Sequence, residues 1–511
     1  MYLTQALHRN ARQMPDAPAG EDADRALTWR ELHEEVGRFA AALRRDGLQP
    51  GDRVAIMARN SVDFLVYLYA TWWAGGVVNP VNLRWTAHEI AFSLNDCDTR
   101  FLLVQREFLP IVPDLAATVP GLSNVVLLSH EGAPGIPGRA EWLAGMVPVE
   151  DALRRNDDLA AILYTGGTTG RSKGVMLSHA NLVASMFGTI AASGYLTQRH
   201  LHVPPLFHVG ALSNLIIAVA TGATSFFLPA FDAAAVPEAI SRWQVEELFL
   251  VPTMIRAMMD APGFVAANLA CLRRIRYGAS PIDDSLLARA MAAFPHAGFA
   301  QGYGMTELSP VATVLPAQDH VLGIEGAKRR ASAGRATPVC EVRVVGPDGT
   351  DRPTGEIGEI TVRGPTVMLG YWNLPEATAE AVRDGWMHTG DLGFMDSEGY
   401  VTVVDRLKDM IVTGAENVYS AEVENALSSH AAVAQVAVIA LPDEKWGERV
   451  HAVIVPRPGA QPDATDLVDH CRKLIAAYKL PRSFAFVEAL PLTAAGKPLK
   501  SELRANPAYH G

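Results

Sequence analysis

The N-terminal part of the chain alternates amphipathic helical stretches with short apolar runs. Over 25–47, apolar residues recur at helical spacing until Gly47 ends the pattern, which predicts a helix. The same patterns predict further helices over 62–75 and 87–100 and strands over 52–58, 76–82 and 101–104. Strand, helix and strand at this spacing are typical of βαβ units in a parallel sheet.

A second alternation of the same kind follows between residues 180 and 300. It predicts helices over 181–194 and 238–244 and strands over 223–228 and 247–251. Two such blocks in succession indicate two related α/β subdomains. After Ser332 the hydrophobic pattern changes and predicts a small β-rich unit. Its alternating strands and glycine turns are predicted over 341–350, 355–364 and 399–406.

The pattern changes again past Arg406. There it predicts a helix over 420–430, a strand pair over 433–455 and a helix over 466–478, which together form a compact α+β unit. The predicted fold class is therefore α/β. A large N-terminal domain, residues 1–405, holds the two subdomains and the β-rich piece, and a smaller C-terminal α+β domain spans residues 406–511.

Composition narrows the classes of function. The 511 residues include 44 Lys and Arg against 55 Asp and Glu, a net charge of −11 without any basic run, which argues against a nucleic-acid partner. The longest apolar run, 64–78, contains Gly75-Gly76 and falls short of the roughly 18 residues of a membrane span, so it predicts a buried helix followed by a strand. Four dispersed cysteines, and an N-terminus unlike a signal peptide, favour reduced thiols and a cytoplasmic location over disulfides or a zinc site.

The strongest local signal is a loop rich in glycine and threonine. It lies between an apolar strand over 159–164 and a segment over 175–187 that is predicted to be helical, and it reads Thr165-Gly166-Gly167-Thr168-Thr169-Gly170-Arg171-Ser172-Lys173-Gly174. Backbone N–H groups, hydroxyls and a lysine in such a loop suit the binding of polyphosphate. The spacing fits neither Gly-x-x-x-x-Gly-Lys-[Ser/Thr] nor Gly-x-Gly-x-x-Gly. A flexible surface linker is the alternative, and the flanking strand and terminal Lys-Gly argue against it.

This loop resembles the phosphate loop of the acyl-adenylate-forming enzymes, which comprise acyl- and aryl-CoA synthetases, adenylation domains of peptide synthetases and beetle luciferases. Their loop has the form Thr-Ser-Gly-Thr-Thr-Gly-x-Pro-Lys-Gly, so this chain departs from it at Gly166 and Ser172. The hydroxyl missing at Gly166 is expected to weaken a contact with phosphate, which need not abolish activity in a loop that is mobile in the family. The resemblance implies that ATP phosphates are bound by Thr165, Gly166, Gly167, Thr168, Thr169, Gly170 and Lys173.

Two further motifs of the family follow in order. Gly302-Tyr303-Gly304-Met305-Thr306-Glu307 resembles its core motif, which implies that Tyr303 stacks on the base, Thr306 contacts a phosphate and Glu307 binds Mg²⁺. Asp391, at the end of Gly385-Trp386-Met387-His388-Thr389-Gly390-Asp391, resembles the residue that accepts hydrogen bonds from both ribose hydroxyls. Taken alone, these segments would be interpreted as an ordinary turn and a solvated aspartate. Because they follow the phosphate loop in the order that the family shows, a nucleotide-binding role is favoured.

Motifs near the C-terminus complete the resemblance. Arg406 resembles another ribose contact, Lys408 the hinge position, and Gly414 part of the loop that enters the site for the second half-reaction. Lys497 resembles the lysine required for adenylation, although Ala495 stands where the family usually has Ser or Thr. Solvated surface residues are the alternative interpretation of these positions.

The resemblance implies a two-step ligation. A carboxylate attacks the α-phosphate of ATP to give an acyl-AMP and pyrophosphate, and a thiol, expected to be that of CoA, then displaces AMP. Mg²⁺ on Glu307, together with Lys173 and Lys497, would offset the repulsion between the two anions. The C-terminal domain is expected to act as a lid that rotates about Lys408 between the two steps.

A segment around His208 is expected to border the acid. Pro204-Pro205-Leu206-Phe207-His208-Val209-Gly210 resembles the family segment whose Phe-His pair lies beside the carboxylate and the thiol channel, and a satisfied core histidine is the alternative. The pocket is expected to be lined by positions up to Ser213 and by Phe207, Val209, Gly210, Tyr277, Gly278, Ala279 and Val311. These residues are mostly small and none is charged, which predicts a neutral, apolar acid of the medium-chain fatty, cyclic or aromatic kind. Gly210 stands where some hydroxycinnamate ligases carry tyrosine, so the pattern does not single out a coumarate-type pocket.

Other functions fit parts of the pattern. An acyl-adenylate-forming ligase could load the thiol of a carrier protein, although CoA is the simpler acceptor because no carrier module follows Gly511. Nothing in the sequence demands a luciferase-type oxygenase. A non-catalytic nucleotide sensor on the same scaffold has no physical need for Glu307, Asp391, Arg406 and Lys497 together. A homodimer is expected only because enzymes of this family are often homodimers, and no residue pattern in the sequence predicts it.

Overall fold

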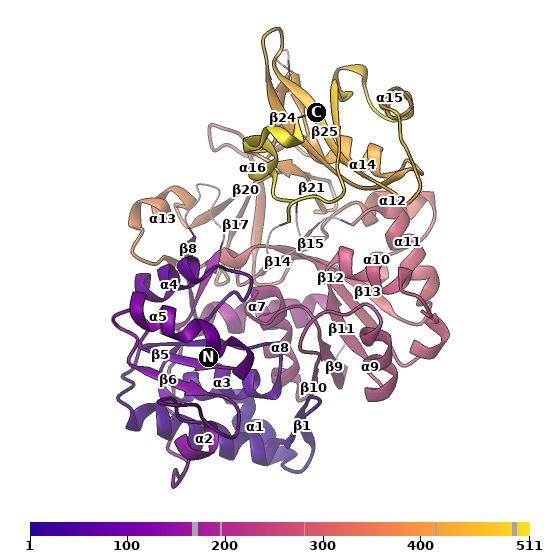
Figure 1. The fold of residues 1–511 in the computed structure, drawn as a ribbon. Coiled ribbons are helices and arrows are strands. Elements are labelled where there is room, and N and C mark those ends of the chain that lie inside the picture. Colours follow the sequence, from indigo (N-terminus) through magenta and orange to yellow (C-terminus); the bar gives the residue numbers. More distant parts are fainter. Residues whose placement is uncertain (166–171, 195–196, 281, 414–415, 493–497, 511) are drawn as a thin grey trace.

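The computed structural model of the protein describes residues 1–165, 172–194, 197–280, 282–413, 416–492 and 498–510. In Figure 1 most of the chain forms one large body, and the C-terminal part, coloured light orange to yellow, forms a smaller unit above it. The predicted fold class, a large α/β domain followed by a smaller α+β one, is confirmed.

A sheet of seven strands lies in the N-terminal half of the large body. Its order is β18-β8-β7-β4-β3-β5-β6, and the strands from β7 to β6 are parallel, as the βαβ pattern predicts. The strands are β3 (Arg53–Met57), β4 (Val77–Pro80), β5 (Phe101–Val104), β6 (Asn124–Leu127), β7 (Leu159–Thr165), β8 (Lys173–Ser178) and β18 (Gly370–Tyr371). Along β3, Val54 and Ile56 join the main core while Ala55 and Met57 join a second core, so both faces are buried.

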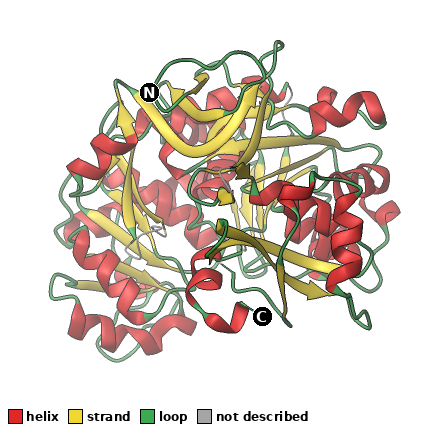
Figure 2. Ribbon diagram, turned by 90° about the horizontal axis from the view of Figure 1, so that it is seen from above, coloured by secondary structure: helices red, strands yellow, loops and turns green. Residues whose placement is uncertain are grey.

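Helices cover both faces of this sheet. α2 (Trp29–Arg45) and α3 (Val62–Ala74) pack in the main core, and α4 (Ala87–Asp96) and α5 (Val112–Thr118) pack in the second core. The other helices of this region are α1 (Gln5–Gln13) and α6 (Arg139–Trp142). Seen from above in Figure 2, the helices lie mainly outside the strands, the layering expected for parallel sheets.

A second, nine-stranded sheet forms the other half of the body. Its order is β15-β14-β13-β12-β11-β9-β10-β1-β2, and the strands from β13 to β1 are parallel. The strands are β1 (Pro18–Glu21), β2 (Ala26–Thr28), β9 (Arg199–His202), β10 (Thr224–Phe227), β11 (Glu247–Leu250), β12 (Arg274–Gly278), β13 (Gly298–Gly304), β14 (Val311–Leu315) and β15 (Arg335–Ala336). The two helices α7 (His179–Ser193) and α8 (Val209–Thr221) pack in the main core with strands of both sheets.

The outer face of the nine-stranded sheet has its own core. Ile275 and Tyr277 of β12 point into it, together with side chains of three helices. These helices are α9 (Ala235–Trp243), α10 (Pro252–Asp260) and α11 (Asp284–Ala293). Because side chains alternate along a strand, Arg274 and Arg276 of β12 point to the opposite face, toward α7.

The predicted β-rich piece and the predicted C-terminal unit are two further sheets. The first contains β16 (Glu341–Val345), β17 (Gly358–Arg363), β19 (Val382–Arg383), β20 (Trp386–Met395) and β21 (Val401–Arg406), with α12 (Ile324–Arg330) before it and α13 (Pro375–Ala381) within it. The second contains β22 (Ile411–Thr413), β23 (Glu416–Val418), β24 (Val433–Asp443), β25 (Gly447–Pro456) and β26 (Ser483–Phe486), with α14 (Ser420–Ser428), α15 (Ala464–Arg472) and α16 (Lys500–Ala505). The chain changes sheets between Arg406 and Ile411, next to the predicted boundary at 405/406, which stays a prediction as a division into two domains.

The longest apolar run folds as its pattern predicts. Ser61 accepts a hydrogen bond from the N–H of Phe64 and starts α3, and Gly75 ends the helix at a φ of 94°, in the left-handed region that favours glycine. The chain then continues as β4, and the helix is buried along its length. Among the described helices, none is both long and apolar enough to cross a membrane.

Two predicted helices begin later than expected. In the predicted helix 25–47, Ala26–Thr28 forms β2 and α2 begins at Trp29. The segment 175–187 was expected to be helical from its start, but Lys173–Ser178 forms β8, and α7 begins only at His179. β8 pairs antiparallel with β7 on one side and with β18 on the other, and this pairing overrides the helical pattern of the short segment. The capping box of Ser178 and Asn181 then sets the start of α7.

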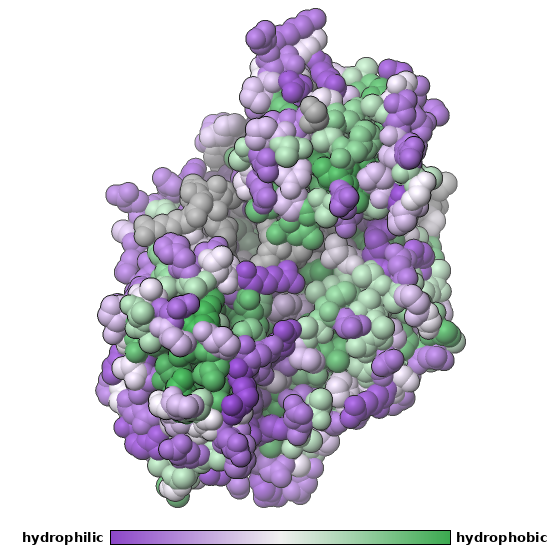
Figure 3. Space-filling model, viewed as in Figure 1, coloured by the Kyte–Doolittle hydropathy of each residue, from purple (hydrophilic) through white to green (hydrophobic). Residues whose placement is uncertain are grey.

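An apolar hollow lies near α5 and β6, among the residues that the structure describes. In Figure 3, hydrophobic residues reach the surface over the region where Figure 1 places α4 and α5, while hydrophilic residues cover most of the outline. A hollow of about 570 Å³ lies here, between α5, β6 and Trp142, and it is distant in sequence from every motif singled out above.

Candidate active site

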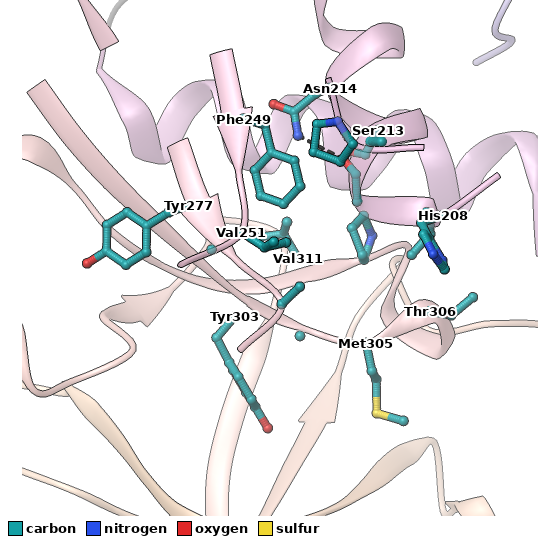
Figure 4. Close-up of a pocket in the computed structure, with 18 of the residues that line it drawn as sticks. His208, Ser213, Asn214, Phe249, Val251, Tyr277, Tyr303, Met305, Thr306 and Val311 are labelled. Carbon is teal, nitrogen blue, oxygen red and sulfur yellow. Dashed lines mark hydrogen bonds between the residues drawn. The ribbon is translucent and has the colours of Figure 1, made fainter. Parts of the chain in front are cut away.

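A cavity of about 660 Å³ collects most of the motif residues. Its lining includes Thr165, Lys173, His208, Val209, Gly210, Tyr277, Ala279, Gly302, Tyr303, Gly304, Thr306, Glu307, Val311 and Arg406. These residues come from both sheets, from α8 and from the end of β21, so segments far apart in sequence meet at one place. In Figure 4, Ser213 and Asn214 project from α8, Tyr303 and Met305 lie across the cavity from them, and His208, the N-cap of α8, lies beside Thr306.

Other predicted residues lie beside the cavity or outside the described chain. Phe207, Gly278, Asp391 and Lys408 are not part of the lining. Tyr277 borders the cavity, but its side chain points away in Figure 4 and its hydroxyl lies 2.9 Å from His320 Nε2. The predicted residues Gly166, Gly167, Thr168, Thr169, Gly170, Gly414 and Lys497 lie outside the described residues.

The two described ends of the predicted phosphate loop lie side by side. Thr165 at the end of β7 pairs with Lys173 at the start of β8. The Nζ atom of Lys173 lies 4.7 Å from the centroid of the Tyr371 ring, and the hydroxyl of Tyr371 donates a 2.9 Å hydrogen bond to Glu307 Oε1. The loop ends are thereby connected to the core motif through Tyr371, which the sequence analysis missed.

Glu307 fits the role of a metal ligand. Its side chain is buried, and burial raises its pKa, an effect that hydrogen bonding by the Glu307 backbone N–H, the hydrogen bond from Tyr371 and the charges of Arg406 and Lys173 oppose. The Tyr371 hydrogen bond occupies one of the roughly four lone-pair sites of the carboxylate. One carboxylate oxygen with additional oxygens from phosphate is a typical donor set for Mg²⁺.

Asp391 joins two motifs at the rim of the cavity. The Tyr303 hydroxyl donates a 2.8 Å hydrogen bond to Asp391 Oδ2, and Arg406 Nε lies 2.6 Å from Oδ1. Burial, and then the charge of Asp391, raise the pKa of Tyr303 well above its usual range, which keeps the phenol protonated. A carboxylate can accept several hydrogen bonds, so Asp391 can bind a ligand hydroxyl while it keeps Tyr303 and Arg406.

The lining contributed by α8 follows helical spacing. His208 stands at the N-cap of α8 with its ring 4.5 Å from that of Phe207, and the wall continues with Val209, Gly210, Ala211, Ser213, Asn214 and Ile217. Leu212 instead joins the main core. An added Cβ at Gly210 would lie 3.5 Å from the Phe249 ring, so this glycine sets the width between α8 and β11.

The lining also contains polar residues that the sequence analysis missed. Thr189, Asn214 and Arg276 border the cavity, whereas the predicted pocket residues include no charged side chain. The signal that could have found Arg276 is the alternation of β12. Residues 274 and 276 share one face, and residues 275 and 277 share the other.

The comparison with protein families decides the assignment. The family described as AMP-binding enzyme matches residues 7–372, and the C-terminal domain of AMP-binding enzymes matches residues 422–497. The chain belongs to the AMP-binding enzyme family. The resemblance to the acyl-adenylate-forming enzymes is thereby confirmed, and relatives named as CoA ligases support the acid–CoA ligase branch.

Relatives match this AMP-binding enzyme over nearly its whole length. A feruloyl-CoA synthase of Amycolatopsis sp is 39% identical over 502 residues, which cover 97% of both chains. The fatty acid–[acyl-carrier-protein] ligase ScoC of Streptomyces coeruleorubidus is 37% identical over 510 residues, covering 98% of this chain and 96% of ScoC. The solved structure of ATP-bound MatB from Rhodopseudomonas palustris is 32% identical, with a TM-score of 0.89 and 99% coverage of both chains.

Proposed function

We propose that this AMP-binding enzyme is an acid–CoA ligase that joins a carboxylic acid to CoA through an acyl-AMP. The observation that carries the proposal is that the nucleotide motifs and the apolar wall of α8 line one and the same cavity. ATP, CoA and the acid are its substrates. The apolar wall favours a carboxylic acid whose hydrocarbon part is either a medium-length chain or a ring. The relative named as a feruloyl-CoA synthase supports an aromatic ring.

In the first step, a carboxylate oxygen attacks the α-phosphorus of ATP, and the bond to pyrophosphate breaks. Lys173 and Arg406 bring positive charge to the cavity, and Thr165 and Thr306 offer hydroxyl donors to the phosphates. Mg²⁺ bound by Glu307 and the phosphates would supply further positive charge. Tyr303 and Asp391 are assigned to the base and the ribose.

In the second step, the CoA sulfur attacks the acyl carbon, and AMP leaves with the electrons of the broken C–O bond. The C-terminal unit is assigned a rotation about Lys408 between the steps, because the chain passes from one sheet to the other at this place. His208, at the start of α8, borders the path that the thiol would take.

The reaction is tested by acid-dependent exchange of pyrophosphate into ATP without CoA, and by formation of AMP and acyl-CoA when CoA is added. A panel of short-chain, medium-chain, long-chain and aromatic carboxylic acids identifies the class of acid that the enzyme prefers. Cleavage of ATP to ADP and phosphate would contradict the mechanism. Sedimentation of the purified protein tests the homodimer, which stays a prediction.

A carrier-protein thiol is the second candidate acceptor, because the relative ScoC is a fatty acid–[acyl-carrier-protein] ligase. The two acceptors are separated by offering the same acyl-AMP either CoA or a carrier protein that bears phosphopantetheine. Transfer to CoA alone supports the proposed function, and transfer to the carrier alone supports the alternative.

The hinge assignment predicts a selective defect in Lys408→Pro. Proline fixes φ near −65°, so it is expected to slow the transfer to CoA at least about tenfold and to leave pyrophosphate exchange within about threefold. Lys408→Ala, which removes the side chain without restricting the backbone, is the matched control. Transfer to CoA at the normal rate in the proline variant would remove the hinge from the mechanism.

Gly210 is predicted to set the width of the acid pocket. Gly210→Ala adds a Cβ at ordinary contact distance from Phe249 and should change activity little. Gly210→Leu projects further toward Phe249 and is expected to lower kcat/KM for aromatic acids by about a hundredfold while short acids are still ligated. The panel of acids measures this shift, and an equal loss for all acids would indicate damage to the fold.

Asp391→Asn is predicted to weaken nucleotide binding. The amide oxygen can still accept one hydrogen bond, but the charge that faces Arg406 and one acceptor are lost, so KM for ATP should rise about tenfold. Pyrophosphate exchange at varied ATP concentrations measures the effect. Asp384→Asn, an exposed aspartate with a φ of 50° that asparagine also adopts, is the control. An unchanged KM in Asp391→Asn would exclude the ribose role.

A further inference from the structure

Part of the cavity wall outside the nucleotide motifs is polar. It includes the hydrogen-bonding side chains of Thr189 of α7, Ser213 and Asn214 of α8, and Arg276 of β12. Arg276 lies two residues, or about 7 Å, before the Gly278 end of its strand. Ser213 and Asn214 lie four to five residues, or about 6–8 Å, along the helix from Val209. Arg276 Nη1 also donates to Ser193, which lies one helical turn after Thr189 in α7, so Arg276 lies near Thr189.

The hydrogen bonds inside the protein leave part of these groups available. Arg276 Nε donates to the Glu247 carboxylate, and Nη1 donates a 2.9 Å hydrogen bond to Ser193 Oγ. Within the described residues, Nη2 of Arg276 and the buried Oγ1 of Thr189 have no partner. Asn214 donates through Nδ2 to the carbonyl of Gly210, which leaves its Oδ1 as an acceptor.

The charges behind this surface favour an electron-rich ligand. Glu247 is buried and lies between the guanidinium groups of Arg276 and Arg274, the latter 3.7 Å away. Burial lowers the pKa of His200 and of His202, the latter to about 3, so both imidazoles are neutral at pH 7. The cluster therefore has one positive charge in excess. An apolar group against Arg276 would leave an N–H donor buried without a partner, which is unfavourable.

Between the entrance and this surface the wall is apolar. Phe249 and Val251 follow Glu247 at every second position, along β11 and the residue directly after it, so their side chains point to the same side. In Figure 4 they lie with Val311 between Tyr303 and Asn214. A ligand that fills this space has an apolar middle and a polar far end. The arrangement resembles other specific pockets, in which few polar groups fix the orientation of a largely apolar ligand.

We infer that the acid carries, at the end opposite to its carboxylate, an oxygen that accepts hydrogen bonds from Arg276 and Thr189. A phenolic hydroxyl or a carbonyl supplies such an oxygen, and a hydroxyl can also donate to Asn214 Oδ1. The inference rests on the proposed function and narrows its substrate from any apolar acid to one with a distal oxygen. Arg276 and Thr189 are then the residues that determine this specificity.

The test compares acids that differ only at the far end. 4-Hydroxycinnamate is compared with 4-methylcinnamate, which has nearly the same shape, and 8-hydroxyoctanoate is compared with nonanoate in the same way. In at least one series, kcat/KM for acyl-CoA formation should be at least about tenfold higher for the oxygen-bearing acid, mainly through KM. 4-Carboxycinnamate distinguishes a neutral oxygen from a second carboxylate.

Variants identify the groups responsible. Thr189→Val keeps the shape of the side chain, and Arg276→Lys keeps the charge but loses the forked donor. Each variant should bring the preference for the oxygen-bearing acid over its methyl counterpart to within about threefold. Thr71→Val is the matched control, because Thr71 of α3 is also buried with a hydroxyl that has no described partner, and it lies outside the cavity lining.

The outcomes separate the inference from the proposed function. If no acid of the wider panel gives acyl-CoA, the proposed function fails. If acids are ligated but both oxygen-bearing acids react no better than their methyl counterparts, the inference is overturned and the proposed function stands. It is also overturned if Thr189→Val, folded as shown by an unchanged Tm, retains the full preference.

Discussion

Replacing Lys497 with alanine is expected to lower the rate of acyl-AMP formation by about a hundredfold to a thousandfold. The resemblance assigns this lysine to the charge that develops between the carboxylate and the α-phosphate, and an alanine cannot offset that charge. Thioester formation from supplied acyl-AMP should continue near the normal rate, because pyrophosphate has already left. Pyrophosphate exchange measures the first step, and release of AMP from acyl-AMP and CoA measures the second.

The described neighbours of Lys497 support this expectation. Leu492 lines the cavity and pairs with Pro498 across an antiparallel bridge, so both described ends of the segment that contains Lys497 lie next to each other at the site. Lys500, the other lysine nearby, is already bound to Glu424 at 2.7 Å and to Ser420 at 2.6 Å. The exposed Lys473 of the same unit serves as the control through Lys473→Ala. Equal loss of both half-reactions in Lys497→Ala would contradict the role.

The sequence predicted the elements whose own pattern determines them. α3 and β4 follow from one apolar run divided by two glycines, and β5 coincides with the apolar run 101–104. β8 was missed because the residues 173–178 form a strand only through pairing with β7 and β18, and β18 lies almost two hundred residues later in the chain. Such long-range pairing has no signal in a short window of sequence.

The site was predicted where a motif fixes the residue, and missed where packing does. Tyr303, Thr306 and Glu307 are adjacent in sequence, so one hexapeptide identifies them. Arg276 has no motif around it. It reaches the cavity because β12 alternates and its partner Glu247 begins the neighbouring strand, and both facts depend on the register of the sheet. The predicted lining residues carry no charge, and Arg276 is a charged lining residue that no motif identifies.

The buried ion pair behind the cavity predicts the largest effect on stability. Glu247→Gln is expected to lower the free energy of unfolding by about 3–5 kcal/mol, because Arg276 and Arg274 would lose the carboxylate that compensates their burial. The pKa of Glu247 in the folded protein is about 2: burial raises it, and the charge of Arg276, with the charge of Arg274 and the hydrogen bond from Arg276, outweighs this and lowers it. A lowered folded pKa means that the contribution is fully present above the ordinary pKa of about 4.5 and is lost as the pH falls toward 2.

The loss in Glu247→Gln should therefore be the same at pH 6.5 and at pH 8.5, where the carboxylate is charged in both the folded and the unfolded state. Urea unfolding of both proteins at these two pH values measures it. Glu246→Gln is the matched control, since this neighbouring carboxylate is only partly buried and accepts a hydrogen bond from the N–H of Gln198 that the amide oxygen can also accept. Equal, small losses in the two variants would mean that the cluster is solvated, and Arg276 would then have no unsatisfied charge to direct toward a ligand.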